Sequence, residues 1–101
     1  QDSLTTALEA HRAGRFVEAT QLYEAIVAQE PANAAAWHLL GVVNHQQSRH
    51  SRAVECFSRA IAREPQTAAF HVGLAEAQRA LGQFEQSAAS CLAAISLQGD
   101  Q

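Results

Sequence analysis

The sequence repeats itself at an interval of 34 residues, and this period limits the fold more than any other feature. Pro31 precedes Pro65 by 34 positions, and Ala19 precedes Ala53 by the same distance. A fixed period of this size marks a repeat array, in which each unit buries its apolar face against its neighbours. The 101 residues are enough for three such units in one domain. We place the units at about residues 1–33, 34–67 and 68–101.

Each unit is predicted to contain two helices, because apolar residues recur at helical spacing on either side of a break. Gly14 and Gly82 suit the left-handed conformation that ends a helix, and Pro31 pushes the residue before it out of the helical region. No segment shows the strict alternation of a half-buried strand, so the predicted fold class is all-α. Short connections make neighbouring helices antiparallel. The candidate N-terminal caps are Asp2 or Ser3, Asn33 and Thr67. The first expected helix ends at Gly14. The other five run from about Phe16 to Pro31, from Asn33 to Ser48, from about Ser51 to Arg63, from Thr67 to Gly82, and from about Phe84 to Leu97.

Composition excludes several classes of function. The net charge is -3, from ten acidic and seven basic residues, and it lacks the basic footprint of a nucleic-acid binder. No apolar stretch is long enough to cross a bilayer, and the first residues lack the regions of a signal peptide, so we expect a cytoplasmic protein without a membrane partner. Cys56 and Cys91 hold different positions of neighbouring units, and we expect both to be buried thiols.

The middle unit resembles the tetratricopeptide repeat family. It carries the family's signature residues at their intervals: Trp37, Leu40, Gly41, Ala53, Phe57, Ala60 and Pro65, with Asn44 in place of an aromatic residue. The third unit keeps Leu74, Ala75, Gly82, Phe84 and Ala94, but has His71, Ser87, Cys91 and Gly99 where Trp, Ala, Phe and Pro are usual. The first unit keeps Ala7, Gly14, Ala19, Tyr23 and Pro31, and departs at Ser3 and Thr6. The resemblance implies an α-solenoid whose helix pairs form a right-handed superhelix with a concave groove.

Small and aromatic residues have structural roles in this interpretation. Small side chains allow the two helices of a unit to approach closely where they cross, and Tyr23 and Phe57 are expected to fill the space between successive units. The small residues are predicted to pair as Gly41 with Ala53, Ala7 with Ala19, and Ala75 with Ser87.

The resemblance also implies which side chains line the groove. The predicted groove residues are Leu4, Leu8, His11 and Arg12 of the first unit, His38, Leu39, Val42 and His45 of the second, and Val72, Glu76 and Arg79 of the third. An apolar floor with a polar edge suits a protein partner that offers an amphipathic helix or an extended peptide. The alternative is that a neighbouring helix of the same or another copy covers these residues.

Two known groove types of the family do not match this sequence. The positions that clamp a chaperone's terminal carboxylate hold no basic or amide side chain, and those of the asparagine ladder of sugar transferases lack asparagine. The clamp positions hold Leu4, Leu8, Leu39, Ala69 and Gly73, and the ladder positions hold Thr5, Leu39 and Gly73.

Neither a metal site nor a catalytic site is predicted. His11 and His45 share a repeat position, but no carboxylate or cysteine completes a ligand set at local spacing, and His38 is about 10 Å from His45 along a helix. The sequence also lacks a nucleophile elbow, a phosphate-binding glycine loop and a paired-carboxylate pocket. We therefore expect a binding protein without a cofactor, and not an enzyme.

The last expected helix has no charged residue from Gln86 to Gly99, although terminal repeats need a polar outer face. Two explanations are open. The chain is a fragment whose next repeat or domain covers Leu92 and Ile95, or copies form a homodimer through them. The run from His38 to Ala53 is similar to repeats in front of bacterial glycosyltransferase, sulfotransferase or methyltransferase domains. That similarity implies a module that recruits or tethers partners for a transferase domain outside this chain.

Overall fold

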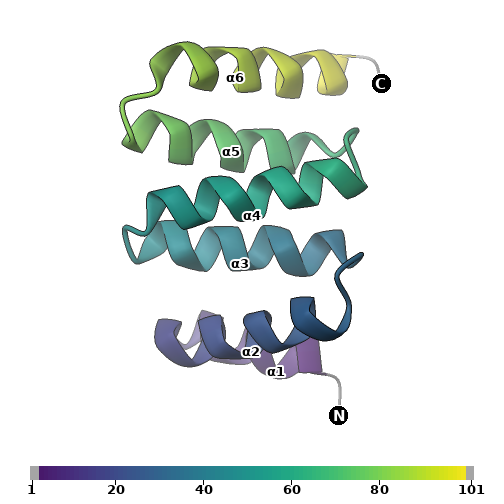
Figure 1. The fold of residues 1–101 in the computed structure, drawn as a ribbon, viewed down its shortest axis with the longest axis vertical. Coiled ribbons are helices and arrows are strands. Elements are labelled where there is room, and N and C mark those ends of the chain that lie inside the picture. Colours follow the sequence, from purple (N-terminus) through teal and green to yellow (C-terminus); the bar gives the residue numbers. More distant parts are fainter. Residues whose placement is uncertain (1–2, 100–101) are drawn as a thin grey trace.

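The computed structural model describes residues 3–99 and contains six helices in that range. Their bounds are α1 (Ser3–Arg12), α2 (Phe16–Gln29), α3 (Ala34–Gln46), α4 (His50–Arg63), α5 (Ala68–Ala80) and α6 (Phe84–Gly99). The helices stack along the longest axis of a molecule that measures 38 × 28 × 21 Å (Figure 1). The predicted all-α solenoid is confirmed, and residues 3–99 contain no strand.

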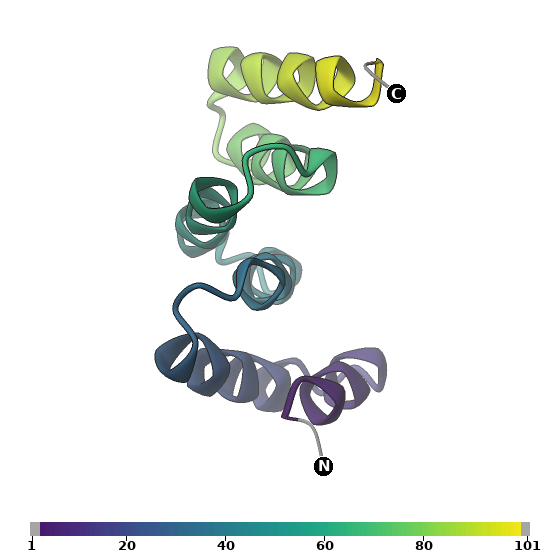
Figure 2. The same ribbon diagram turned by 90° about the vertical axis from the view of Figure 1, so that its right-hand side faces the viewer.

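The helices pair within units and then pack between units. α1 packs against α2, α3 against α4, and α5 against α6, while α3 contacts α2 and α5 contacts both α3 and α4. The first helices α1, α3 and α5 lie on one side of the stack, with α2 and α4 on the other (Figure 2). Each unit therefore offers its surface to the first helix of the unit that follows.

The turn inside each unit uses the same left-handed residue. Gly14 and Gly82 have φ angles of +81° and +80°, and Ser48 occupies the equivalent position of the middle unit with φ +64°. Since a side chain is disfavoured in this conformation, Ser48 ends α3 at a cost that the two glycines avoid. The left-handed Ser48 also explains why α3 stops at Gln46, two residues before the expected end.

The predicted caps have different outcomes. Asn33 caps α3, because its side-chain Oδ1 accepts a hydrogen bond from the Ala36 backbone N–H at 3.0 Å. Thr67 occupies the predicted N-cap position of α5, but its side chain makes no capping hydrogen bond, since its hydroxyl donates to the Glu64 carboxylate at 3.2 Å. Ser3 is the first residue of α1, and the alternative cap, Asp2, lies outside the described residues.

The small residues allow close packing. Ala7, Ala19 and Ala53 are fully buried, and the Ser87 hydroxyl donates to the Ala75 carbonyl oxygen at 2.8 Å, as close crossing of α5 and α6 requires. A Cβ added to Gly41 would lie 2.9 Å from the Phe57 ring. Glycine at position 41 therefore leaves room for this ring, and the predicted pairing of Gly41 with Ala53 stays a prediction.

Two aromatic residues join successive units, as expected. Tyr23 is fully buried in a core cluster that includes Leu40 and Val43 of α3. Phe57 is 1% exposed and lies between Gly41 and Gly73, so its ring connects the second unit to the third.

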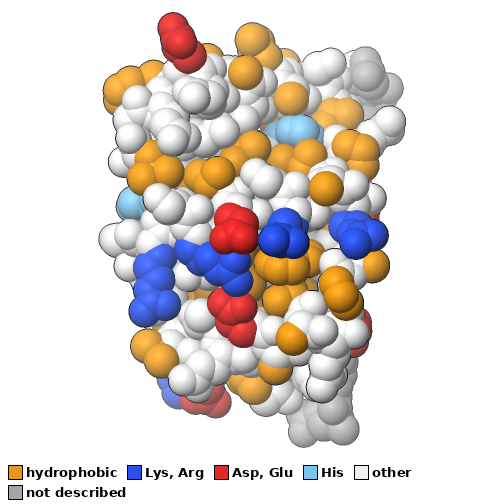
Figure 3. Space-filling view, viewed as in Figure 1, with side chains coloured by type: hydrophobic (Ala, Val, Ile, Leu, Met, Phe, Trp, Pro, Cys, Tyr) orange, Lys and Arg blue, Asp and Glu red, His pale blue; other side chains and the backbone are white. Residues whose placement is uncertain are grey.

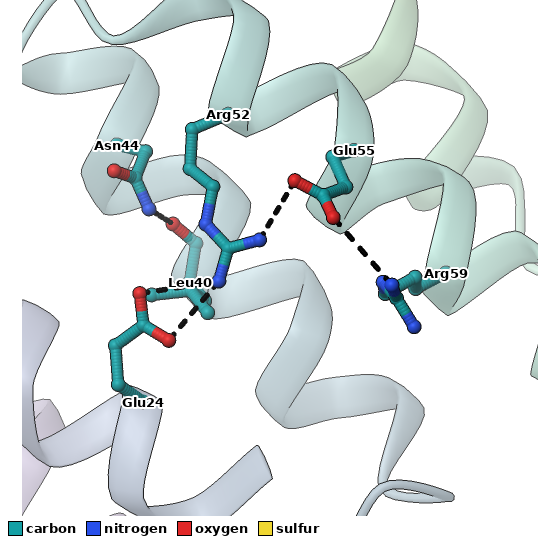
Figure 4. A network of polar contacts seen from close by, with 6 residues as sticks. All are labelled: Glu24, Leu40, Asn44, Arg52, Glu55 and Arg59. Atoms are coloured by element: carbon teal, nitrogen blue, oxygen red, sulfur yellow. Dashed lines mark hydrogen bonds and ion pairs between the residues drawn. The ribbon is translucent and has the colours of Figure 1, made fainter. Parts of the chain in front are cut away.

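A polar network crosses the surface of the first two units (Figure 4). The Arg52 guanidinium donates to Glu24 of α2 at 3.0 Å and to Glu55 of α4 at 2.8 Å, and it lowers the pKa of Glu55. Arg59 also contacts Glu55, at 3.5 Å, and lies over the Trp37 ring at 5.0 Å. These charged side chains are half-exposed, so the network adds only modestly to stability.

Candidate protein-binding site

The apolar groove residues predicted in the first two units are largely used for packing. Leu4 and Leu39 are half-buried and contact the core cluster around Tyr23. Val42 packs against the cluster that contains Phe57, and Leu8 is also half-buried. These side chains therefore offer a partner much less surface than an open apolar floor would.

The predicted histidines have internal partners as well. Because the Gln46 side-chain oxygen accepts, His11 Nε2 donates to it at 2.6 Å, and His11 Nδ1 then accepts from the Tyr23 hydroxyl at 2.9 Å. His45 Nδ1 lies 2.9 Å from Nδ1 of His50, so one of these two rings donates to the other. Arg12 is exposed at the end of α1.

His38 is held between two aromatic rings. Its ring centroid lies 5.5 Å from that of Phe57 and 5.0 Å from that of Phe70. Its Nδ1 is buried and has no hydrogen-bond partner within the described part of the chain. Burial lowers the pKa of His38, so the ring is neutral near pH 7.

The three predicted residues of the third unit instead line an open pocket. Val72, Glu76 and Arg79 of α5 face Cys91, Ile95 and Gln98 of α6 around a volume of about 280 Å³. Val72 is 40% exposed and Ile95 is 63% exposed. Of the eleven predicted groove residues, the structure thus brings these three together at a free surface. Whether any of the eleven binds a partner stays a prediction.

The pocket has charge at its edge and apolar side chains at its base. Neither Glu76 nor Arg79 makes an ion pair with any residue from 3 to 99. Leu92 also lies on α6 and is 66% exposed. On the face that Figure 3 shows, charged side chains gather over the middle of the stack, whereas hydrophobic side chains are spread over its whole length.

Sequence reasoning missed the contribution of Cys91 to this pocket. The prediction that both cysteines are buried is wrong for Cys91, which is exposed, and correct for Cys56. Cys91 stands 34 positions after Phe57, where the family has an aromatic residue. The loss of a ring at this position was the signal in the sequence, because a short side chain there leaves space unfilled.

Ligand clusters for a metal ion and helices of membrane-spanning length were sought among residues 3–99. No three His, Cys, Asp or Glu side chains of residues 3–99 are grouped so that they could hold a metal ion. None of the helices from α1 to α6 has both the length and the apolar character needed to cross a bilayer.

Comparison with known proteins places the chain among repeat proteins. A family model described as Tetratricopeptide repeat matches residues 4–55 and again residues 46–101. The chain belongs to the tetratricopeptide repeat family. No curated protein matches the sequence.

Solved structures with low sequence identity have the same fold. A MamA structure, residues 41 to the end, from Desulfovibrio magneticus RS-1 is 21% identical with a TM-score of 0.93 over 98% of this chain and 56% of the MamA chain. The type III secretion translocator chaperone SycD of Yersinia enterocolitica, in an alternative dimer, is 13% identical with a TM-score of 0.93 over 98% of this chain and 75% of that one. The second tetratricopeptide repeat domain of Spaghetti (RPAP3), bound to an HSP90 peptide, is 15% identical with a TM-score of 0.91 over 94% and 88%.

These matches define the fold and leave the binding partner open. The present chain spans about half the length of the MamA chain. The similarity to repeats in front of transferase domains stays a prediction.

Proposed function

We propose that this chain is a protein-interaction scaffold that holds a helical segment of a partner protein against the α5–α6 surface of its third unit. The observation that carries the proposal is the open pocket between α5 and α6, where Val72 and Ile95 are exposed next to Glu76 and Arg79, which form no ion pair with any residue from 3 to 99. Exposed apolar surface with a polar edge is characteristic of helix-in-groove recognition. The peptide-bound RPAP3 domain, which has the same fold, is consistent with such a role.

The residues of the first two units contribute differently to this function. Leu4, Leu39 and Val42 stabilise the scaffold, so a charge placed at Leu39 would damage the fold before it tested binding. Arg12 is exposed and is available to extend the contact along α1. The proposed role needs no catalysis and no cofactor, and the cytoplasmic location stays a prediction.

The proposal is tested with two matched variants of the full chain. Ile95 and Val17 are both 63% exposed, but only Ile95 lines the pocket. We expect Ile95→Glu to lose the partner proteins that the wild type captures from its source cell extract, whereas Val17→Glu retains them and both keep wild-type circular dichroism. Equal capture by the wild type and Ile95→Glu would contradict the proposed binding face.

Self-association is a second candidate function, because Leu92 and Ile95 are highly exposed on the outer helix. A homodimer through α6 would cover both side chains, and so would a further domain of a longer protein, including the transferase-type domain implied by the sequence. Light scattering at several concentrations separates these cases. A dimer that Leu92→Glu dissociates would favour self-association, whereas a concentration-independent monomer would exclude it.

A further inference from the structure

The pocket on the third unit is the repeat equivalent of a surface that a helix covers at both earlier junctions. Val72 and Cys91 stand 34 positions after His38 and Phe57. In the second unit α5 covers that surface, because Phe70 lies over the His38 ring at 5.0 Å and Gly73 lies against Phe57. We therefore expect the partner helix of the proposed function to pack on the third unit in the same way as α5 packs on the second unit.

The first junction has the same arrangement. Leu4 and Tyr23, which precede His38 and Phe57 by 34 positions, belong to one core cluster with Leu40 and Val43 of α3. A first helix thus covers the equivalent surface in both cases. We call the corresponding surface on the third unit, formed by Val72, Glu76, Arg79, Cys91 and Ile95, the third-unit seat.

The third-unit seat differs from the second-unit surface in which of the two packed elements supplies the bulky side chain. At the second junction the Phe57 ring projects from α4, and the covering helix must have glycine at position 73 because even an added Cβ would lie 2.7 Å from the Phe57 Cζ atom. In the third unit the ring is replaced by the short side chain of Cys91, which is exposed in the pocket. A bulky side chain of the partner helix, at the position where α5 has Gly73, fills this space.

A polar contact gives the register of the partner helix. At the first junction His11 Nε2 donates to Gln46 of the covering helix at 2.6 Å. Arg79 occupies the His11 position of the third unit and has no carboxylate partner in residues 3–99. Gln46 follows Leu39 by seven residues, and Leu39 is the repeat equivalent of Gly73. Residues seven apart lie two helical turns apart on nearly the same face.

We propose that the third-unit seat selects an amphipathic partner helix with a bulky apolar residue seven positions before a carboxylate. The apolar side chain fills the space above Cys91, and the carboxylate pairs with the Arg79 guanidinium in a charge-assisted hydrogen bond. This specificity rests on the proposed function and assigns it a partner chemistry.

The test uses the full chain and labelled peptides copied from residues 66–83. These peptides contain α5, and a chemical cross-link between outward-facing positions keeps them helical, since short isolated helices are marginally stable. One peptide keeps the natural sequence, and a second carries Gly73→Leu and Ala80→Glu, because Ala80 is the repeat equivalent of Gln46. By fluorescence anisotropy, we expect the second peptide to bind about tenfold more tightly or better, equivalent to 1.4 kcal/mol.

Variants of the chain locate the two contacts. Cys91→Phe restores the ring of the second unit, so it should reverse the preference and favour the peptide that keeps glycine. Arg79→Glu should weaken the Ala80→Glu peptide about tenfold, and a peptide with Ala80→Arg should restore binding. The comparison of the two peptides on the unmodified chain needs no variant, so it remains decisive even if Cys91→Phe does not fold.

The outcomes distinguish this specificity from the proposed function. Equal binding of both peptides, lost in Ile95→Glu and kept in Val17→Glu, would overturn the specificity and leave the binding face intact. Absence of binding by either peptide, or binding that Ile95→Glu does not change, would overturn both. A dimer in light scattering that neither peptide dissociates would show that a second copy fills the seat, and would also overturn the proposal.

Discussion

The interlocking of Phe57 and Gly73 predicts that one added methyl group destabilises the fold. In an unconstrained helix interior, Gly→Ala stabilises by about 1 kcal/mol. In Gly73→Ala the new Cβ would lie 2.7 Å from Cζ and 2.8 Å from Cδ1 of Phe57. The ring is 1% exposed and also lies against Gly41, so it has little space in which to move away. Overpacking of this kind costs about 3 kcal/mol at its upper range, which leaves a net loss of about 2 kcal/mol.

Urea unfolding followed by circular dichroism measures this loss. With an m-value of about 1 kcal/mol per M for a small domain, the midpoint of Gly73→Ala should fall by about 2 M. Gly99→Ala is the matched control, because an added Cβ there meets no atom within 4 Å. Its midpoint should equal or slightly exceed that of the wild type.

A double-mutant cycle tests whether the loss of stability comes from the contact between the new methyl group and the Phe57 ring. Phe57→Leu removes ring atoms that the new methyl group would meet, so Gly73→Ala should cost much less in that background. A Gly73→Ala protein as stable as the wild type would refute the reasoning. An equal cost in both backgrounds would show that the loss does not come from the ring.

Three further predictions concern single positions. Ser48→Gly should raise the free energy of unfolding by about 1 kcal/mol, because glycine tolerates the left-handed conformation; an unchanged melting temperature would contradict this. Burial lowers the pKa of His38 in the folded protein, so stability should be complete above about pH 6.5 and decrease as the pH falls toward the folded pKa, whereas His38→Leu should lack this decrease. An identical pH dependence of unfolding in both proteins would exclude His38 as its source. At pH 8 a thiol reagent should modify Cys91 in the native protein and Cys56 only after unfolding, since Cys56 is buried and burial raises the pKa of its thiol to about 11; rapid modification of both would refute this.

The sequence was sufficient to predict the helices because the repeat places the same stop signals in each unit. Gly14 and Gly82 end their helices in the left-handed conformation, and Asn33 forms the predicted cap. Whether Thr67 makes a capping hydrogen bond could not be predicted from its type alone, since its hydroxyl has a competing acceptor in Glu64. The left-handed Ser48 was equally hidden, because serine has no intrinsic preference for positive φ.

The candidate site was less predictable because the groove positions of each unit also contact the next unit. Leu4 and His38 were predicted as groove residues, but in the folded chain they pack on the core cluster and on Phe70. Their repeat equivalent Val72 remains exposed. The difference in exposure between Val72 and its equivalents arises because α3 and α5 pack on the units before them. Repeat positions in the sequence do not show this packing.

The binding site that we propose is formed by residues that depart from the pattern of the repeat. Arg79 replaces the histidine of the first two units, Glu76 replaces Leu8 and Val42, and Cys91 replaces an aromatic ring. All three departures line one pocket, at the only one of the three equivalent surfaces that no helix among residues 3–99 covers. In the covered units these positions satisfy a neighbour within the chain, so their side chains are fixed by packing. No helix among residues 3–99 sets that constraint in the third unit, and the partner helix that we propose supplies both the bulky side chain and the carboxylate to an apolar cavity edged by the Arg79 guanidinium.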